Sequence, residues 1–162
     1  DLGKLFNVSL LITAAVLHGY RALRWRPWVT LQTPLVWSLH LSYWFIVLGF
    51  LLLAASKLEL GISHSQAIHS FTIGGMGLMI LAMISRVSLG HTGRPLQVTK
   101  LMSFAFLLMV IAFAARFLAQ SISSFYSVGL LVATLSWCLA FILFIMHYSK
   151  ILSQARPDGR PG

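Results

Sequence analysis

Residues 125–148 read FYSVGLLVATLSWCLAFILFIMHY and contain no Asp, Glu, Lys or Arg. The run is longer than the ~20 residues that a helix needs to cross a bilayer core of ~30 Å. An extended segment of this length would leave backbone groups without hydrogen-bond partners in lipid, so a helix is expected. The sequence therefore predicts that this segment spans a membrane.

The rest of the 162-residue chain repeats this pattern. Hydrophobic residues make up 58% of it and charged residues only 9%, whereas soluble domains carry about 25% charged residues. Breaks at Arg26-Pro27, Thr33-Pro34 and Gly93-Arg94-Pro95 separate the apolar runs. The other four runs cover residues 5–20, 34–56, 68–85 and 101–118. We expect an all-α fold, a polytopic transmembrane bundle of about five spanning helices.

The chain has no internal linker that would divide it. We expect residues 1–152 to form a single transmembrane helical domain and residues 153–162 to form a polar cytoplasmic tail. Because Asp1 begins the chain without a secretory signal pattern, we expect the C-terminal part of a longer protein, whose remaining N-terminal helices would be partners. The single cysteine, Cys138, excludes an internal disulfide framework and an all-cysteine metal site.

The formal net charge of +9 would indicate a nucleic-acid partner in a soluble protein. Here the basic residues lie between apolar runs, so they predict topology and no nucleic-acid partner is expected. Lys4, Lys57 and Arg116 fall on one side of the membrane, and the other nine Lys and Arg residues fall on the opposite side. The positive-inside rule then places the C-terminus in the cytoplasm, with membrane lipid as a partner of the basic loops.

Four of the six histidines lie near the cytoplasmic ends of predicted helices or in the loop between two of them: His18, His40, His91 and His147. Neutral imidazole is a common ligand of haem iron and copper. We expect His18, His40 and His147 to form the core of a cofactor site, because they lie at similar depth. The alternative is that each histidine only occupies the membrane interface or binds a backbone carbonyl.

His69 needs a separate site. It begins the third run on the outer side, and the helix from His69 to His91 would span about 33 Å. If His69 binds a metal, its partners are other groups on the outer side. His64 is expected to lie in a wet loop.

The most informative motif covers residues 69–95, which read HSFTIGGMGLMILAMISRVSLGHTGRP. This combination of glycines, histidines and arginines resembles the NnrS family of bacterial polytopic membrane proteins, of which the chain would be a C-terminal portion. The resemblance implies a haem- and copper-containing protein of the bacterial inner membrane. It also implies an association with nitric oxide metabolism and with resistance to nitrosative stress.

The small residues of this motif also have a plain physical interpretation. Ser70, Gly74 and Gly77 present a small-residue stripe, which favours close helix packing and alternatively makes room for a flat macrocycle. Met76, Met79 and Met83 recur at helical spacing. They favour adaptable core filling over thioether ligation of copper.

Residues 86–95 are expected to form a cytoplasmic loop, with Gly90 in the left-handed conformation and Pro95 starting the next helix. The planar guanidinium groups of Arg86 and Arg94 suit carboxylates. We expect these arginines to anchor an anionic edge of the cofactor, with His91 as a ligand or hydrogen-bond donor beside it. Phospholipid head groups are the rival partner.

Two classes of function remain open. The first is a metal-cofactor protein, either a redox enzyme or a gas sensor. The second is a cofactor-free transporter or channel subunit with a polar path lined by His40 and Arg116. Glu59 is the only acid between Asp1 and Asp158, which argues against a proton-driven transporter. Cofactor binding is favoured, and no catalytic triad, Walker motif or dinucleotide motif assigns an enzymatic reaction.

Overall fold

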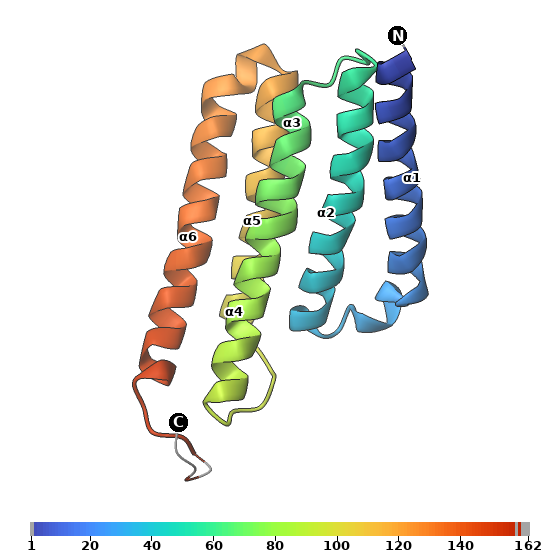
Figure 1. The fold of residues 1–162 in the computed structure, drawn as a ribbon. Helices are drawn as coiled ribbons and strands as arrows, with labels where there is room; N and C mark the ends of the chain where they lie inside the picture. The colour runs from blue at the N-terminus through green and yellow to red at the C-terminus, as the bar shows by residue number, and fades with distance from the viewer. Residues whose placement is uncertain (1, 158, 160–162) are drawn as a thin grey trace.

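The computed structural model describes residues 2–157 and 159, which form a bundle of long helices (Figure 1). The described part of the chain contains helices and no strand. In chain order the elements are α1 (Leu2–Arg24), η1 (Pro27–Thr30), α2 (Pro34–Lys57), α3 (His64–His69), η2 (Ser70–Gly77), α4 (Leu78–His91), α5 (Lys100–Ser121), η3 (Ser123–Phe125) and α6 (Tyr126–Leu152). This confirms the predicted all-α fold.

Five of these helical segments are long and apolar enough to cross a membrane. They are Leu2–Arg24, Pro34–Lys57, His64–His91, Lys100–Ser121 and Ser123–Leu152, and the third consists of α3, η2 and α4 without a break. Each contains one of the five apolar runs of the sequence. The chain therefore begins at one end of the bundle and finishes at the other, as Figure 1 shows.

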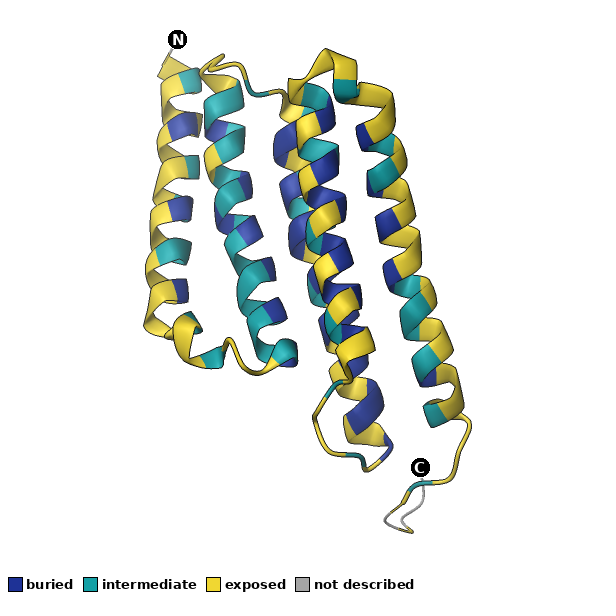
Figure 2. Ribbon diagram, turned by 180° about the vertical axis from the view of Figure 1, so that it is seen from behind, coloured by how far each residue is buried: buried dark blue, intermediate teal, exposed yellow. Residues whose placement is uncertain are grey.

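The two ends of the bundle are named here by their position in Figure 1. The upper end carries the connection after Lys57 and the turn around η3, and the lower end carries η1 and the loop from Thr92 to Thr99. α1 packs against α2, α2 packs against α3, η2 and α4, and α5 packs against α6. α1 and α6 lie at opposite edges of the bundle (Figures 1 and 2).

The interior lies between α4, α5 and their neighbours, and the outer faces are apolar. Leu78, Leu81, Met102, Phe106 and Met109 are fully buried. Figure 2 shows that buried residues face the middle of the bundle while one side of each edge helix is exposed. An apolar outer surface is what lipid requires, so the hydrophobic effect alone does not hold these helices together. Close packing of small side chains also stabilises the contacts between helices in a membrane.

Several predicted boundaries are wrong, because charged residues extend the helices. α1 continues past Tyr20 to Arg24, and α4 continues through Arg86 to His91, so the expected loop starts only at Thr92. His64, expected in a loop, begins α3. Long basic side chains can reach water from the last turns of a helix, and such residues do not have to lie in a loop.

The start of α5 also differs from the prediction. Gly90 is helical, and Gly93 instead takes the left-handed conformation with φ of 66°. α5 begins at Lys100, after Pro95, and the side chain of Thr99 caps it by accepting from the backbone N–H of Met102. Only glycine adopts such a φ without strain, which fixes the turn at Gly93.

Candidate functional site

Two of the predicted ligands, His18 on α1 and His40 on α2, belong to one group of rings. We call His18, Trp25, His40 and Tyr43 the ring cluster. The Nδ1 atom of His18 lies 2.5 Å from the hydroxyl oxygen of Tyr43. The Trp25 ring lies 4.8 Å from Tyr43 and 5.8 Å from His40, measured between ring centroids. The structure therefore brings His18 and His40 into one continuous set of contacts.

Small residues on α1 position this cluster. The buried residues of α1 are Val8, Ala15 and Ala22, which recur every seven residues along one stripe. Gly19, beside His18, faces α2, where a Cβ atom would meet Val47 at 3.7 Å. Such small side chains let two helices approach closely in a membrane. The close approach carries the ring of His18 to Tyr43.

The hydrogen bond to Tyr43 involves Nδ1 of His18 and leaves Nε2 as the other ring nitrogen. In the tautomer that carries its proton on Nδ1, His18 donates to the Tyr43 oxygen, and the lone pair of Nε2 is free to bind a metal. Metal-binding histidines usually have their other ring nitrogen fixed in this way. Phe50 stacks on the His18 ring at a centroid distance of 5.7 Å and further limits its orientation.

His147 does not join the ring cluster. It lies on α6, where its ring contacts the neighbouring Tyr148 at a centroid distance of 5.0 Å. α6 and α1 occupy opposite edges of the bundle (Figure 1). The structure thus places His147 away from His18 and His40, although all three lie five or six residues from a lower helix end. Their roles as metal ligands stay predictions.

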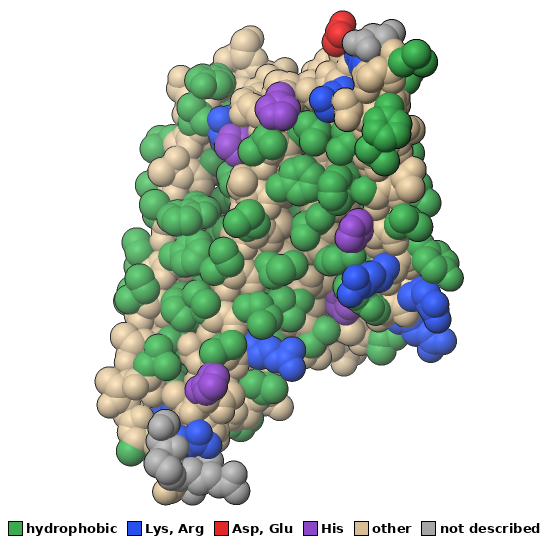
Figure 3. Space-filling model, viewed as in Figure 1, with side chains coloured by type: hydrophobic (Ala, Val, Ile, Leu, Met, Phe, Trp, Pro, Cys, Tyr) green, Lys and Arg blue, Asp and Glu red, His purple; other side chains and the backbone are tan. Residues whose placement is uncertain are grey.

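Histidines are spread over the molecule. Figure 3 shows them over α1 and α2, at the lower end of α4 and at the upper end of α3, without a single patch. Among the described residues, no group of three His, Cys, Asp or Glu side chains is placed to hold a metal ion.

Arg86 and His91 on α4 line the same cavity, and Arg94 in the following loop does not. Arg86 and His91 line a shallow cavity of about 300 Å³ with Met83, Val87, Gly90 and Leu96. Arg94 turns toward the end of α6. Its Nη1 atom lies 3.5 Å from the carbonyl oxygen of Ile151, and its Nη2 donates to Gln154 at 3.3 Å. The guanidinium of Arg94 is thus engaged in joining two segments of the bundle.

The tail after α6 makes a contact in return. Arg156 Nη1 donates to the carbonyl oxygen of His91 at 2.9 Å. This carbonyl lies in the last turn of α4, where backbone acceptors have no partner within the helix. Arg94, which follows α4, therefore contacts a carbonyl at the end of α6. Arg156, which follows α6, donates to a carbonyl at the end of α4.

His69 at the end of α3 and Arg116 near the end of α5 both lie in the upper half of the bundle. The Nδ1 atom of His69 and the Nη1 atom of Arg116 are buried, and neither has a hydrogen-bond partner among the described residues. Arg116 lines a cavity of about 310 Å³ with Ile73, Leu130, Ala133, Thr134 and Trp137. His40 is not among these lining residues.

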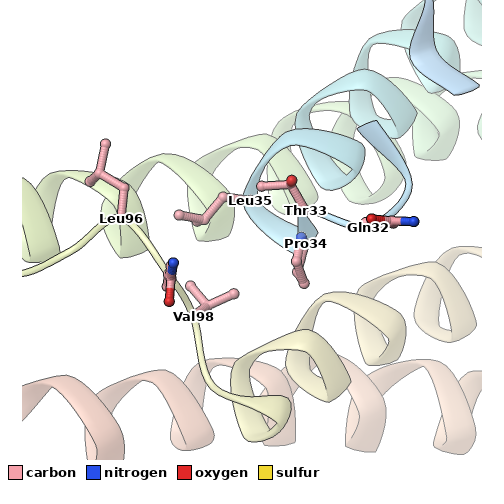
Figure 4. A pocket seen from close by; sticks show the side chains of 7 residues that line it. Gln32, Thr33, Pro34, Leu35, Leu96 and Val98 are labelled. Carbon is pink, nitrogen blue, oxygen red and sulfur yellow. The ribbon is translucent and has the colours of Figure 1, made fainter. Parts of the chain in front are cut away.

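A larger cavity lies at the lower end and lacks ionisable side chains. It measures about 420 Å³ and lies where the start of α2 faces the loop before α5 (Figure 4). Its lining residues are Gln32, Thr33, Pro34, Leu35, Leu96, Gln97 and Val98. This set offers amide and hydroxyl groups but none of the ligands that haem iron or copper prefers.

Three features of these sites were missed from the sequence. Tyr43 lies three residues after His40, a spacing that puts both on one face of α2. The same spacing could have marked it as a partner of the cluster. The π-helix at η2 (Ser70–Gly77) leaves no sequence signal beyond its glycines. The sequence also does not indicate that Nη1 of Arg116 is buried without a hydrogen-bond partner, because this depends on the residues packed around it.

The family of the chain follows from a comparison with known families. The sequence model of a protein family, described as "NnrS protein", matches residues 2–156 of this chain, which is nearly its whole length. The chain belongs to the NnrS family. This confirms the resemblance seen in residues 69–95, and with the five spanning segments it identifies a multi-pass membrane protein. No curated protein and no solved structure matches the chain.

Proposed function

We propose that this NnrS-family protein binds haem and copper in the bacterial inner membrane and acts in nitric oxide metabolism and resistance to nitrosative stress. The family match over residues 2–156 supports the assignment to this kind of membrane protein. The C-terminus lies in the cytoplasm, as the basic residues of the lower end favour. The ring cluster is the part of this chain best suited to hold an iron or copper ion.

The observation that carries the proposal is the hydrogen bond between His18 Nδ1 and Tyr43. With the ring proton on Nδ1, this bond would orient the imidazole and leave Nε2 as the atom that binds the metal. Haem iron, when bound, supplies an open coordination position for a diatomic gas such as nitric oxide. His18 would hold the metal and Tyr43 would hold His18, while Phe50 stacks on the His18 ring and Trp25 packs beside Tyr43.

The donor set fits haem better than a copper site complete within this chain. Haem iron needs only one or two axial ligands, and a histidine serves that purpose. Copper sites typically take three or more, and the described residues contain no group of three. His40, His69, His91 and His147 are therefore proposed as partial copper or haem sites that ligands from the rest of the protein complete.

Arg86 and His91 are proposed to face an anionic edge of the cofactor, because they share the cavity on α4. Arg94 is the weaker candidate for that role, since its guanidinium already binds Ile151 and Gln154. Anionic phospholipid remains the competing partner of Arg86.

The test is an absorption spectrum with metal analysis of purified full-length protein and three variants. His18→Ala should lose the Soret band of the haem that this site holds, and Tyr43→Phe should keep haem but shift its reduction potential. His64→Ala is the matched control, because His64 is exposed at the upper end. Unchanged haem content and potential in both His18→Ala and Tyr43→Phe would remove the ring cluster from the proposal.

A further inference from the structure

Arg116 is a basic residue inside a membrane-spanning helix. It lies five residues before the end of α5 at Ser121, about 7.5 Å along the helix axis. Charged groups inside a membrane are costly unless they are paired, and they usually mark a binding site or pathway. The Nη1 atom of Arg116 is buried and has no hydrogen-bond partner among the described residues. The guanidinium therefore has a buried N–H donor at Nη1 that no described residue uses.

The described part of the chain offers no carboxylate to Arg116. Glu59 is the only acidic side chain among the described residues, and its Oε1 lies 2.7 Å from Lys4 Nζ. The side chain of Glu59 is 82% exposed at the upper end of the bundle. Glu59 is therefore engaged by Lys4, and no other described side chain is acidic.

The polar side chains one turn above Arg116 are already engaged. Gln66 Nε2 donates to the carbonyl oxygen of Phe117 and to Ser121 Oγ, at 3.2 and 2.8 Å. Gln66 Oε1 accepts from the backbone N–H of Ser63, and Gln120 Oε1 accepts from the hydroxyl of Ser63. These groups form a closed network between α3 and α5, so their amide oxygens do not serve Arg116.

The cavity beside Arg116 presents hydrogen-bond donors on apolar walls. Thr134 and Trp137 contribute a hydroxyl and an indole N–H, and neither makes a hydrogen bond among the described residues. Ile73, Leu130 and Ala133 make up the rest of the lining. Thr134 and Trp137 are exposed on α6, which forms an edge of the bundle, so the cavity opens toward the membrane.

We propose that this cavity binds an anionic amphiphile of the membrane, with its oxyanion head on Arg116 and its acyl chain along α6. The head is a carboxylate or a phosphate, since the planar fork of arginine matches both. Trp137 and Thr134 supply the further donors, and the apolar walls hold the first carbons of the chain. The site does not depend on the proposed haem or copper.

The test is native mass spectrometry of the full-length protein in detergent. It is titrated separately with oleate, phosphatidylglycerol, phosphatidylcholine and acetate. Oleate or phosphatidylglycerol should bind at one saturable site, and which of the two binds more tightly identifies the head as carboxylate or phosphate. Phosphatidylcholine and acetate should bind weakly, because one lacks net negative charge and the other lacks a chain.

Arg116→Gln should weaken this binding about tenfold or more, which corresponds to the loss of one charge-assisted hydrogen bond. Arg116→Lys should restore part of it, and Thr134→Val should weaken it in a protein whose charge is unchanged. Lys57→Gln is the matched control, because Lys57 is an exposed basic residue at the same end and does not line the cavity.

Equal binding by wild type, Arg116→Gln and Thr134→Val would overturn the proposal. So would equal loss in Lys57→Gln, which would indicate general attraction to basic residues. Haem content is measured on the same samples. If Arg116→Gln lost haem and kept lipid binding, the cavity would belong to the cofactor and the lipid site would be wrong.

Discussion

The hydroxyl of Ser70 donates to the carbonyl oxygen of Phe45 at 2.7 Å, and this hydrogen bond joins the π-helix η2 to α2. Both residues are buried. The ring of Phe45 then covers Gly74, one turn further along η2, where a Cβ atom would meet Phe45 Cγ at 2.5 Å. The wider turn of a π-helix and the missing side chains of its glycines thus let α2 lie directly against η2. Such segments are often found at functional sites.

We expect Gly74→Ala to destabilise the protein. The added methyl group collides with the Cβ and Cγ atoms of Phe45. These atoms lie next to the backbone of α2, so they cannot move aside freely. Overpacking of this kind costs about 1–3 kcal/mol. The measurement is the thermal unfolding midpoint in detergent, which should fall by several degrees.

Gly90→Ala is the matched control for this substitution. Gly90 is also helical, but a Cβ atom there would meet its nearest neighbour, Leu96, only at 3.9 Å. Replacing a helical glycine by alanine is favourable by about 0.8–1.0 kcal/mol when space is available. The midpoint of Gly90→Ala should therefore stay or rise. A fall equal to that of Gly74→Ala would contradict the packing argument.

Arg94 and Arg86 should behave differently when each is changed to Gln. Arg94→Gln removes the contacts to Ile151 and Gln154, so amide hydrogen exchange in the last turn of α6 should become faster. Because these contacts are long and partly exposed, we expect an effect of about 1 kcal/mol or less. The side chain of Arg86 is exposed and makes no hydrogen bond within the described chain, so Arg86→Gln should leave the exchange of α6 unchanged.

Cofactor content separates this structural role from the proposed one. Faster exchange in Arg94→Gln at unchanged cofactor content would assign Arg94 to helix capping alone. Loss of cofactor from Arg94→Gln with normal exchange would instead revive the expectation that Arg94 binds its anionic edge.

The sequence predicts the spanning segments well because lipid sets a simple requirement. Each segment needs about 20 apolar residues, and four of the five runs approach or exceed that length. Arg86 shows the limit of the argument, since a charge read as a loop marker lies within α4. The hydropathy of a run does not indicate how far a helix continues once its basic side chains can reach the interface.

The candidate site is harder to predict, because depth is only one of the coordinates that locate a residue. His18 and His147 lie at comparable depth, and the order of packing places α1 and α6 at opposite edges. That order depends on small side chains such as Gly19, which bring α1 onto α2. His18 therefore meets Tyr43, and a sequence analysis based on depth grouped it with His147.

Stability should respond weakly to pH through Glu59. A hydrogen bond from Lys4, and then the positive charge of Lys4, hold the pKa of Glu59 below its ordinary value of 4.5. A lowered pKa in the folded state stabilises it above the unfolded pKa, and this contribution is lost as the pH falls through the folded value. The midpoint of wild type should exceed that of Glu59→Gln slightly at neutral pH, and the difference should vanish in strong acid.

Salt gives an independent check of the same ion pair. Both partners are exposed, so the small difference at neutral pH should disappear at about 1 M salt, where the screening length is roughly 3 Å. A difference that persisted in acid and in high salt would assign the effect of Glu59→Gln to something other than Lys4. Glu59 also adopts a left-handed φ of 61°. Glu and Gln disfavour this conformation to the same extent, so backbone strain does not contribute to the difference between wild type and Glu59→Gln.

The orientation of the bundle is the last prediction, and it rests on which end carries the basic residues. Arg21, Arg24, Arg94 and Lys150 lie near the lower end, whereas Lys4 and Lys57 lie at the upper end. Basic residues beside spanning helices are retained in the cytoplasm, so the lower end should face it. A fluorescent protein fused after Gln154 should therefore fluoresce, and alkaline phosphatase fused there should be inactive. Phosphatase inserted after Gly61, in the upper connection, should be active. Three spans separate these two positions, so they lie on opposite sides and the two fusions must give opposite results. An active phosphatase after Gln154 would show that the orientation is the reverse.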